Sequence, residues 1–209
     1  MKYIIMCGGE YNQFKVPKQL AKRNGETLVE RTIRLLRENK VEDIYISSNN
    51  PIFDNFGVQR IDHNNSYKVI DGKLYGYWLD AYYQMNEPCC YIYGDVYFTE
   101  EAMKTIVDYH GSDNTLFGSR MALNEAHENW GEPFAYKVFN NEKFNNGIKE
   151  VKKLQDEGKL KRMALTWELY RYLNNLDVNK QVITDNYVVI DDETIDIDEP
   201  EELEKFNNV

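Results

Sequence analysis

The stretch that decides the fold is Tyr3-Ile4-Ile5-Met6-Cys7-Gly8-Gly9-Glu10-Tyr11-Asn12-Gln13-Phe14-Lys15-Val16-Pro17-Lys18-Gln19-Leu20. Its first five residues are apolar and predict a short buried strand. The strand leads into Gly8-Gly9, where backbone N–H groups can approach an anion because no Cβ is in the way. Lys15 and Lys18 then supply mobile positive charge. The stretch therefore predicts a phosphate-binding loop, although its spacing is neither that of a P-loop nor that of a dinucleotide-binding fold.

Strand and helix patterns alternate after this loop. The periodicity predicts helices over 26–37, 76–85 and 99–109, and strands over 41–46, 58–61 and 89–93. Such an order favours a mostly parallel sheet with right-handed crossovers. The predicted fold class is α/β, a three-layer α/β/α Rossmann-like arrangement around a mixed, mostly parallel sheet.

The second half of the chain is less regular. It predicts strands over 114–120, 133–139, 182–183, 187–190 and 194–198, and helices over 142–157, over 164–173 and from Glu199 onward. The chain has no internal repeat and no Pro/Gly/Ser-rich linker. We therefore expect a single domain over 1–209, with one half at about 1–110 and the other at about 111–209.

Composition excludes several classes of partner. The net charge of −10 over 209 residues argues against nucleic acid or an anionic membrane, although it leaves room for a nucleotide held by local lysines and a metal. No apolar run approaches the length of a membrane span, and the first residues lack a signal-peptide pattern. The three cysteines have no metal-binding spacing and predict buried, reduced thiols. These features indicate a cytoplasmic protein, and they leave a homo-oligomer open.

Carboxylates follow two of the predicted strands. Gly94-Asp95 comes directly after an apolar strand, at the kind of strand end where ligands bind in α/β sheets. An aspartate there can hold Mg²⁺ beside a triphosphate, or it can simply cap the next helix. Asp196 and Asp198 are two residues apart on a predicted strand, so their side chains share one face. Two carboxylates on one face favour a bound cation, although a plain acidic strand end is the alternative.

These three motifs, in this order, resemble those of the nucleotidyltransferases that join an NTP to a phosphorylated sugar, alcohol or similar metabolite. Gly8-Gly9 and Pro17-Lys18 match the family's signature loop, Gly94-Asp95 matches its metal motif, and Asp198 stands two residues before Pro200 as in its C-terminal motif. The loop departs from the pattern because it is about one residue shorter and lacks the expected arginine. The resemblance implies the fold of nucleotide-diphospho-sugar transferases and Mg²⁺ as the cofactor.

The resemblance also implies roles for individual residues. The catalytic residues it implies are Lys18, Asp95 and Asp198, and the Mg²⁺ ligands are Asp95 and Asp198 with Asp196 as a helper. The implied nucleotide-binding residues are Cys7, Gly8, Gly9, Glu10, Gln13, Lys15, Lys18, Ser48, Asn49, Gly76 and Asp95. Trp130, Glu132 and Lys137 are implied to bind the acceptor. No chemistry is assigned to His63, His110 or His127, because none has a partner at a telling spacing.

The implied reaction transfers NMP from an NTP, with CTP slightly favoured, to a small phosphorylated metabolite and releases pyrophosphate. It would serve the synthesis of cell-surface polysaccharide precursors. One alternative is a glycosyltransferase that uses a nucleotide-sugar, although Gly94-Asp95-Val96-Tyr97 lacks the second acid of the usual Asp-x-Asp. Another is a nucleotide-binding protein without catalysis, which the short loop and the missing arginine suggest.

Overall fold

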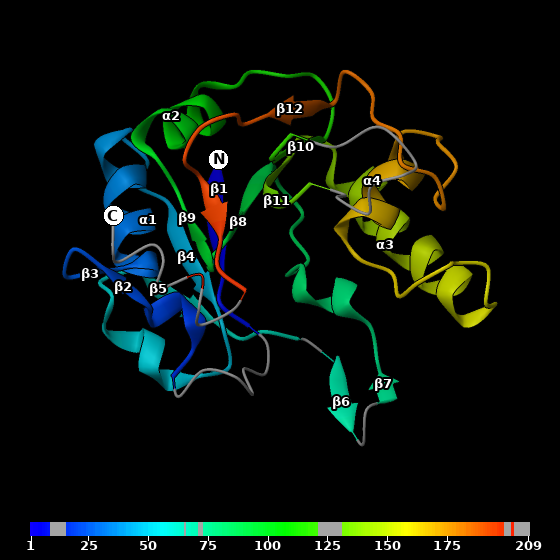
Figure 1. The fold of residues 1–209 in the computed structure, drawn as a ribbon, viewed down its shortest axis with the longest axis horizontal. Helices are drawn as coiled ribbons and strands as arrows, with labels where there is room; N and C mark the ends of the chain where they lie inside the picture. The colour runs from blue at the N-terminus through cyan, green and yellow to red at the C-terminus, as the bar shows by residue number, and fades with distance from the viewer. Residues whose placement is uncertain (9–15, 65, 71–72, 121–130, 199–201, 203–209) are drawn as a thin grey trace.

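The computed structural model describes residues 1–8, 16–64, 66–70, 73–120, 131–198 and 202. Its main feature is a seven-stranded sheet in the order β12-β10-β11-β8-β1-β4-β5 (Figure 1). The strands are β1 (Lys2–Met6), β4 (Ile44–Ser47), β5 (Gln59–Ile61), β8 (Cys89–Tyr93), β10 (Thr115–Gly118), β11 (Pro133–Val138) and β12 (Tyr187–Val189). β11 is antiparallel to both of its neighbours, and the other described pairings in this sheet are parallel. The prediction of a mixed, mostly parallel sheet is confirmed.

Helices cover both faces of this sheet (Figure 1). Helices α1 (Leu28–Glu38) and α2 (Glu100–Asp108) pack on one face, and α3 (Asn141–Asp156) and α4 (Thr166–Leu173) pack on the other. The alternation within β1 sets this division, because Tyr3 and Ile5 join the core under α1 and α2, whereas Ile4 and Met6 join the core under α3 and α4. The predicted three-layer arrangement is thus confirmed.

Three small antiparallel pairs flank the main sheet. They are β2 (Lys22–Arg23) with β3 (Glu26–Thr27), β6 (Lys68–Ile70) with β7 (Lys73–Tyr75), and β9 (Val96–Tyr97) with β13 (Ile195–Asp196). The last pair matters most for function, because it joins the end of the chain to the segment after β8. The backbone N–H of Ile197 also donates to the carbonyl of Asp95, 3.1 Å away.

The first helix begins later than the pattern predicts. Glu26 and Thr27 form a strand, and Thr27 is the N-cap of α1, whose first residue is Leu28. The Thr27 hydroxyl accepts from the Glu30 N–H at 3.2 Å, and the Glu30 carboxylate accepts from the Thr27 N–H at 2.8 Å. This reciprocal capping satisfies two backbone donors and fixes the start of the helix.

The prediction of a helix over 76–85 is wrong. Only the 3₁₀ helix η3 (Trp78–Ala81) forms, and Tyr82 then has extended dihedral angles. The Tyr82 ring is buried edge-on against Tyr91 and Phe144, at centroid distances of 4.9 and 5.2 Å. This aromatic packing outweighs the local helix preference. The strand predicted over 182–183 is also absent from the structure, and the start of the predicted last helix at Glu199 lies outside the described residues.

The remaining short helices are η1 (Lys18–Leu20) and η2 (Pro51–Asn55). Cys7, Cys89 and Cys90 are buried and free, as predicted. Among the described residues, no helix is long and apolar enough to cross a membrane.

Candidate active site

The predicted site residues converge on one edge of the sheet. β1, β4, β5 and β8 are parallel, so their carboxyl ends lie at this edge. The residues that follow these ends include Gly8, Ser48, His63 and Asp95. β11 runs the other way, and its first residue Pro133 therefore lies at the same edge. This geometry brings residues from the start, middle and end of the chain together.

Lys18 lies at the centre of these groups. Its ammonium is 2.7 Å from Asp95 Oδ2 and 2.7 Å from Asp198 Oδ1. Burial alone would lower the pKa of Lys18, but the charges of Asp95 and Asp196 and the hydrogen bonds with Asp198 and Asp95 outweigh it and raise the pKa. Lys18 is therefore a fixed positive charge between two carboxylates, which the sequence placed 77 and 180 residues away.

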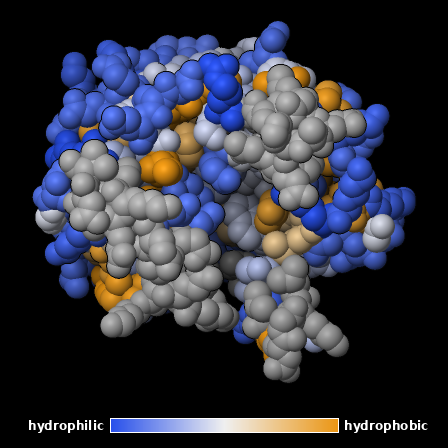
Figure 2. Space-filling model, in the orientation of Figure 1, coloured by the Kyte–Doolittle hydropathy of each residue, from blue (hydrophilic) through white to orange (hydrophobic). Residues whose placement is uncertain are grey.

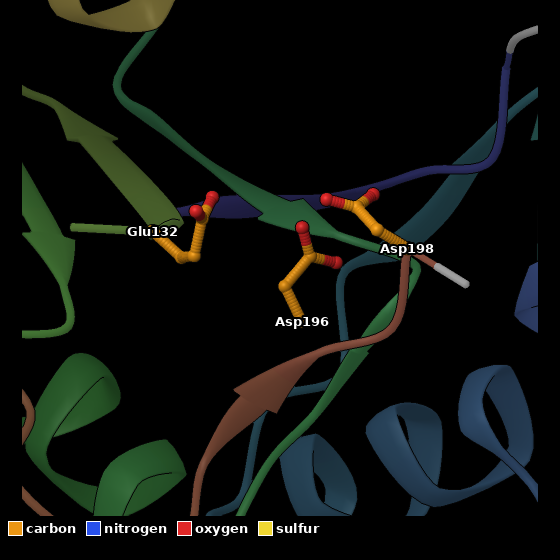
Figure 3. Close-up of side chains that lie close together, drawn as sticks. All are labelled: Glu132, Asp196 and Asp198. Carbon is orange, nitrogen blue, oxygen red and sulfur yellow. The ribbon is translucent and has the colours of Figure 1, made fainter. Parts of the chain in front are cut away.

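Three carboxylates form a second feature of the site. Glu132, Asp196 and Asp198 offer oxygen atoms that all lie within 4.8 Å of one another (Figure 3). Asp196 comes from β13 and lies between the other two in this view. That Asp196 and Asp198 lie on the same side of the chain agrees with the period of a strand.

The electrostatics of this carboxylate group favour a cation. Burial, and then the charge of Asp95, raise the pKa of Asp196 well above its usual range. Burial, and then the charge of Asp198, raise the pKa of Glu132. Asp196 Oδ1 is buried and has no hydrogen-bond partner among the described residues. Because an orphaned buried oxygen is costly, a bound cation would stabilise this arrangement.

The residues present fit a magnesium ion. The donor set consists only of carboxylate oxygens, which Mg²⁺ prefers, and one of these oxygens has no protein donor in the described structure. Asp95, Asp196 and Asp198 are the predicted ligands. Glu132 was predicted to bind the acceptor, and its place beside Asp196 and Asp198 makes it a further candidate ligand. The sequence carried no signal of this, because it depends on the reversed direction of β11.

Gly94 brings Asp95 into position by close packing. A Cβ on Gly94 would lie 2.6 Å from the Met6 carbonyl oxygen and 2.8 Å from the Cys7 Sγ, which is too close for real contacts. The Gly94 N–H donates to the same Met6 oxygen at 3.1 Å. The glycine of the Gly94-Asp95 motif thus lets the end of β8 lie against the end of β1.

A cavity of about 430 Å³ opens beside the carboxylates. Its walls include Lys18, Asp95 and Glu132 on one side and the rings of Trp78, Tyr93 and Trp167. The visible face of the molecule is largely hydrophilic and is hollowed near its centre (Figure 2). The cavity has the mixed polar and aromatic lining of a small-molecule site.

Two aromatic residues that line the cavity, Trp78 and Tyr93, are tied to their neighbours by ring stacking and hydrogen bonds. The Trp78 and Tyr93 rings are stacked, with centroids 6.1 Å apart. The Tyr82 hydroxyl is 2.8 Å from the Tyr93 hydroxyl and 2.8 Å from Thr166 Oγ1, and the Tyr93 and Thr166 hydroxyls are also bonded. Sequence reasoning missed this aromatic lining, since its members come from η3, β8 and α4 and follow no motif.

Of the other predicted nucleotide residues, Cys7, Ser48 and Asn49 lie at this edge of the sheet, and Gly76 does not. Ser48 Oγ accepts from the Asn50 N–H, and Asn49 Oδ1 accepts from the His63 N–H. Burial raises the pKa of the Cys7 thiol well above its usual value, so this side chain is an inert part of the core. Gly76 has a φ of 73° and packs on Ser66, outside the cavity lining. The predictions for Gly9, Glu10, Gln13, Lys15 and Trp130 fall outside the described residues.

The structure does not bring Lys137, a predicted acceptor-binding residue, to the lining of the cavity. The Lys137 side chain is buried, and its Nζ donates to the carbonyl oxygens of Ile106, Val107 and Tyr109 at 2.8, 2.9 and 2.8 Å. These carbonyls end α2, and helix ends leave such groups without helical partners. Lys137 points away from the cavity because β11 alternates its side chains between the two faces of the sheet.

We expect Lys137→Met to destabilise the fold without changing catalysis. The substitution leaves three carbonyls at the end of α2 without their donor, which should cost about 2 kcal/mol of unfolding free energy. Urea denaturation measures this loss, and steady-state kinetics should give an unchanged KM for the acceptor. An increased acceptor KM with unchanged stability would restore the sequence-based assignment.

Comparison with known proteins adds an independent finding. A family model described as the MobA-like NTP transferase domain matches residues 3–165. The match includes the loop through Lys18, Asp95 and Glu132, whereas Asp196 and Asp198 lie beyond it. No curated protein matches the chain.

Solved structures share the fold over nearly the whole chain. A Bacillus anthracis protein assigned as a glucose-1-phosphate thymidylyltransferase is similar at a TM-score of 0.62 and 15% identity, covering 99% of this chain and 94% of that one. The CTP:phosphocholine cytidylyltransferase from Streptococcus pneumoniae gives 0.57 at 16% identity, with 99% and 97% covered. The inositol-1-phosphate CTP transferase from T. maritima gives 0.53 at 15% identity, with 99% and 94% covered.

Proposed function

Because the chain belongs to the MobA-like NTP transferase domain family, it is a nucleotidyltransferase, and we propose that it uses Mg²⁺ to transfer NMP from an NTP to a small phosphorylated sugar, alcohol or similar metabolite, releasing pyrophosphate. The observation that carries this proposal is the meeting of Lys18 with Asp95 and Asp198 at 2.7 Å each. It joins all three sequence motifs in one place, at the edge of the sheet where ligands bind.

The proposed reaction is a single displacement at phosphorus. An oxygen of the acceptor's phosphate forms a bond to the α-phosphorus of the NTP, and the bond from that phosphorus to the bridging oxygen breaks. The electron pair of the broken bond leaves with pyrophosphate. The acceptor phosphate is already ionised at neutral pH, so no general base is required. This agrees with the absence of a histidine from the described lining of the cavity.

The chain's own residues position and neutralise the reactants. Asp95 and Asp198 would hold Mg²⁺, with Asp196 and Glu132 completing the set. When bound, the ion neutralises charge on the triphosphate and the transferred group. Lys18 supplies a second positive charge, which adds electrostatic stabilisation as charge develops on the α-phosphate.

We assign the cavity beside the carboxylates to the acceptor. Its lining includes the aromatic residues Trp78, Tyr93 and Trp167 as well as carboxylates. Such a lining suits a small polar metabolite with some apolar surface. Two of the similar structures are named as CTP-dependent enzymes, which supports CTP as the first nucleotide to test.

Pyrophosphate release tests this function. Purified protein with Mg²⁺ is assayed with CTP, UTP, GTP, ATP and dTTP against a pool of phosphorylated sugars and alcohols. We expect release with one NTP that requires both acceptor and metal. Tight NTP binding in calorimetry without release over a broad pool would favour the binding-only protein, and binding of a nucleotide-sugar instead would favour the glycosyltransferase.

A further inference from the structure

His63 is a buried titratable side chain that the proposed reaction does not use. It follows β5 by two residues and lies outside any described helix or strand, yet only 5% of its surface is exposed. Its backbone N–H donates to Asn49 Oδ1 at 2.7 Å, and its Nδ1 lies 3.2 Å from Ser47 Oγ. His63 is therefore held beside the end of β4 by two polar contacts, one to its ring from Ser47 and one from its backbone to Asn49.

The opposite edge of the ring meets the start of the phosphate-binding loop. A Cβ on Gly8 would lie 2.1 Å from His63 Nε2 and 2.3 Å from Cε1, distances that real Cβ atoms do not show. Gly8 is not among the glycines with positive φ. The requirement for glycine at this position is therefore steric, and the imidazole edge imposes it.

The contact between His63 and Gly8 lies where the proposed nucleotide-binding loop begins. Gly8 follows β1, and the Cys7 N–H just before it donates to the Ser47 carbonyl oxygen at 2.9 Å. Ser47 thus contacts both the backbone of Cys7, the residue before Gly8, and the ring of His63. Nε2 is buried and has no hydrogen-bond partner in the described structure, and burial lowers the pKa of His63, which favours a neutral ring.

We propose that His63 is a positioning residue for NTP binding, because its buried ring fixes the path of the backbone at Gly8. Backbone N–H groups bind phosphate only when they point at it, so a shift of the backbone at Gly8 should weaken phosphate binding. The inference rests on the proposed function, since it assigns a determinant of that site's nucleotide affinity. His63 acts through Gly8 and takes no part in the chemical step.

A double-mutant cycle tests the contact. Gly8→Ala, His63→Ala and the combined variant are titrated by calorimetry with whichever of the five NTPs the wild type binds most tightly, in the presence of Mg²⁺. We expect Gly8→Ala to raise Kd by about tenfold or more and His63→Ala by about fivefold. Because removal of the ring makes room for the new methyl group, the combined variant should bind within about threefold of His63→Ala. If the increase in Kd of the combined variant equals the product of the two single increases, the residues act independently and the proposal is overturned.

His63→Asn separates this role from a purely structural one. Asparagine keeps an atom near Nδ1 for Ser47 but lacks Nε2 and Cε1, the ring atoms nearest to Gly8. We expect it to weaken NTP binding as His63→Ala does, with kcat and the thermal midpoint near those of the wild type. Full rescue of Kd by asparagine would make the Ser47 contact the important one and refute the Gly8 role.

His110 provides the matched control, because it is an exposed histidine after α2. His110→Ala should leave Kd unchanged, and NMR should show the ¹⁵N signals of His63, but not of His110, moving when NTP binds. If the wild type binds none of the five NTPs, the proposed function fails together with this inference. If it binds one and the His63 signals stay fixed, only the inference fails.

Discussion

Replacement of Asp95 by asparagine is expected to lower kcat by about 10³-fold or more while leaving the fold intact. Asp95 lies two residues after β8; its carboxylate pairs with Lys18, and its backbone carbonyl accepts from the Ile197 N–H. An amide of the same shape lacks the negative charge that would hold the proposed Mg²⁺, and loss of several kcal/mol of charge stabilisation corresponds to such a rate effect. Pyrophosphate release at saturating Mg²⁺ measures it.

Stability of this variant should change little, because Asp95→Asn also relieves repulsion with the buried Asp196. The matched control is Asp108→Asn, which removes an exposed carboxylate paired with Lys104 on α2 and outside the cavity lining. It should keep wild-type turnover. Normal pyrophosphate release by Asp95→Asn would disprove the assignment of Asp95 as a metal ligand.

Lys18→Met should produce the second largest effect, a fall in kcat of about 10²-fold. The substitution keeps an unbranched side chain one atom shorter but removes the charge between Asp95 and Asp198. Removal of one preorganised donor at a developing charge typically costs 10²–10³-fold. The loss should appear in kcat and in kcat/KM together, which marks an interaction made in the transition state.

Two further variants sharpen this result. Lys22→Met, at an exposed lysine on β2, controls for general loss of positive charge near the loop and should be neutral. Lys18→Arg retains the charge but replaces a compact ammonium by a planar fork, so it should restore activity only in part. An increase confined to the acceptor KM in Lys18→Met would instead place Lys18 in acceptor binding.

Local patterns were sufficient for the order of elements and for the main motifs. Apolar alternation and helical spacing report the burial of each segment directly, so the strands of the main sheet and α1–α4 were found, with shifts of a few residues at their ends. The error at 76–85 has a specific cause. The Tyr82 ring packs against Tyr91 and Phe144, residues that local spacing cannot reveal as its partners.

In the candidate site, too, local motifs predicted some residues, whereas the surroundings of others depend on contacts between distant segments. Lys18, Asp95 and Asp198 were recognisable because each stands in a short motif, and they meet in space. Glu132 and Lys137 were both predicted to bind the acceptor, but the structure places them in different surroundings. The antiparallel direction of β11 brings Glu132 to the carboxylates, and the alternation of its side chains turns Lys137 to the end of α2.

Residue type and short-range spacing alone thus predict the α/β class, the alternating order of its elements and three motifs, whose resemblance to a known family implies nucleotidyl transfer. Only the tertiary structure decided which distant side chains share a cluster, which lysine caps a helix and why Gly8 must be a glycine. Those properties depend on strand direction and on contacts between segments far apart in the chain, such as the imidazole of His63 against the backbone of Gly8.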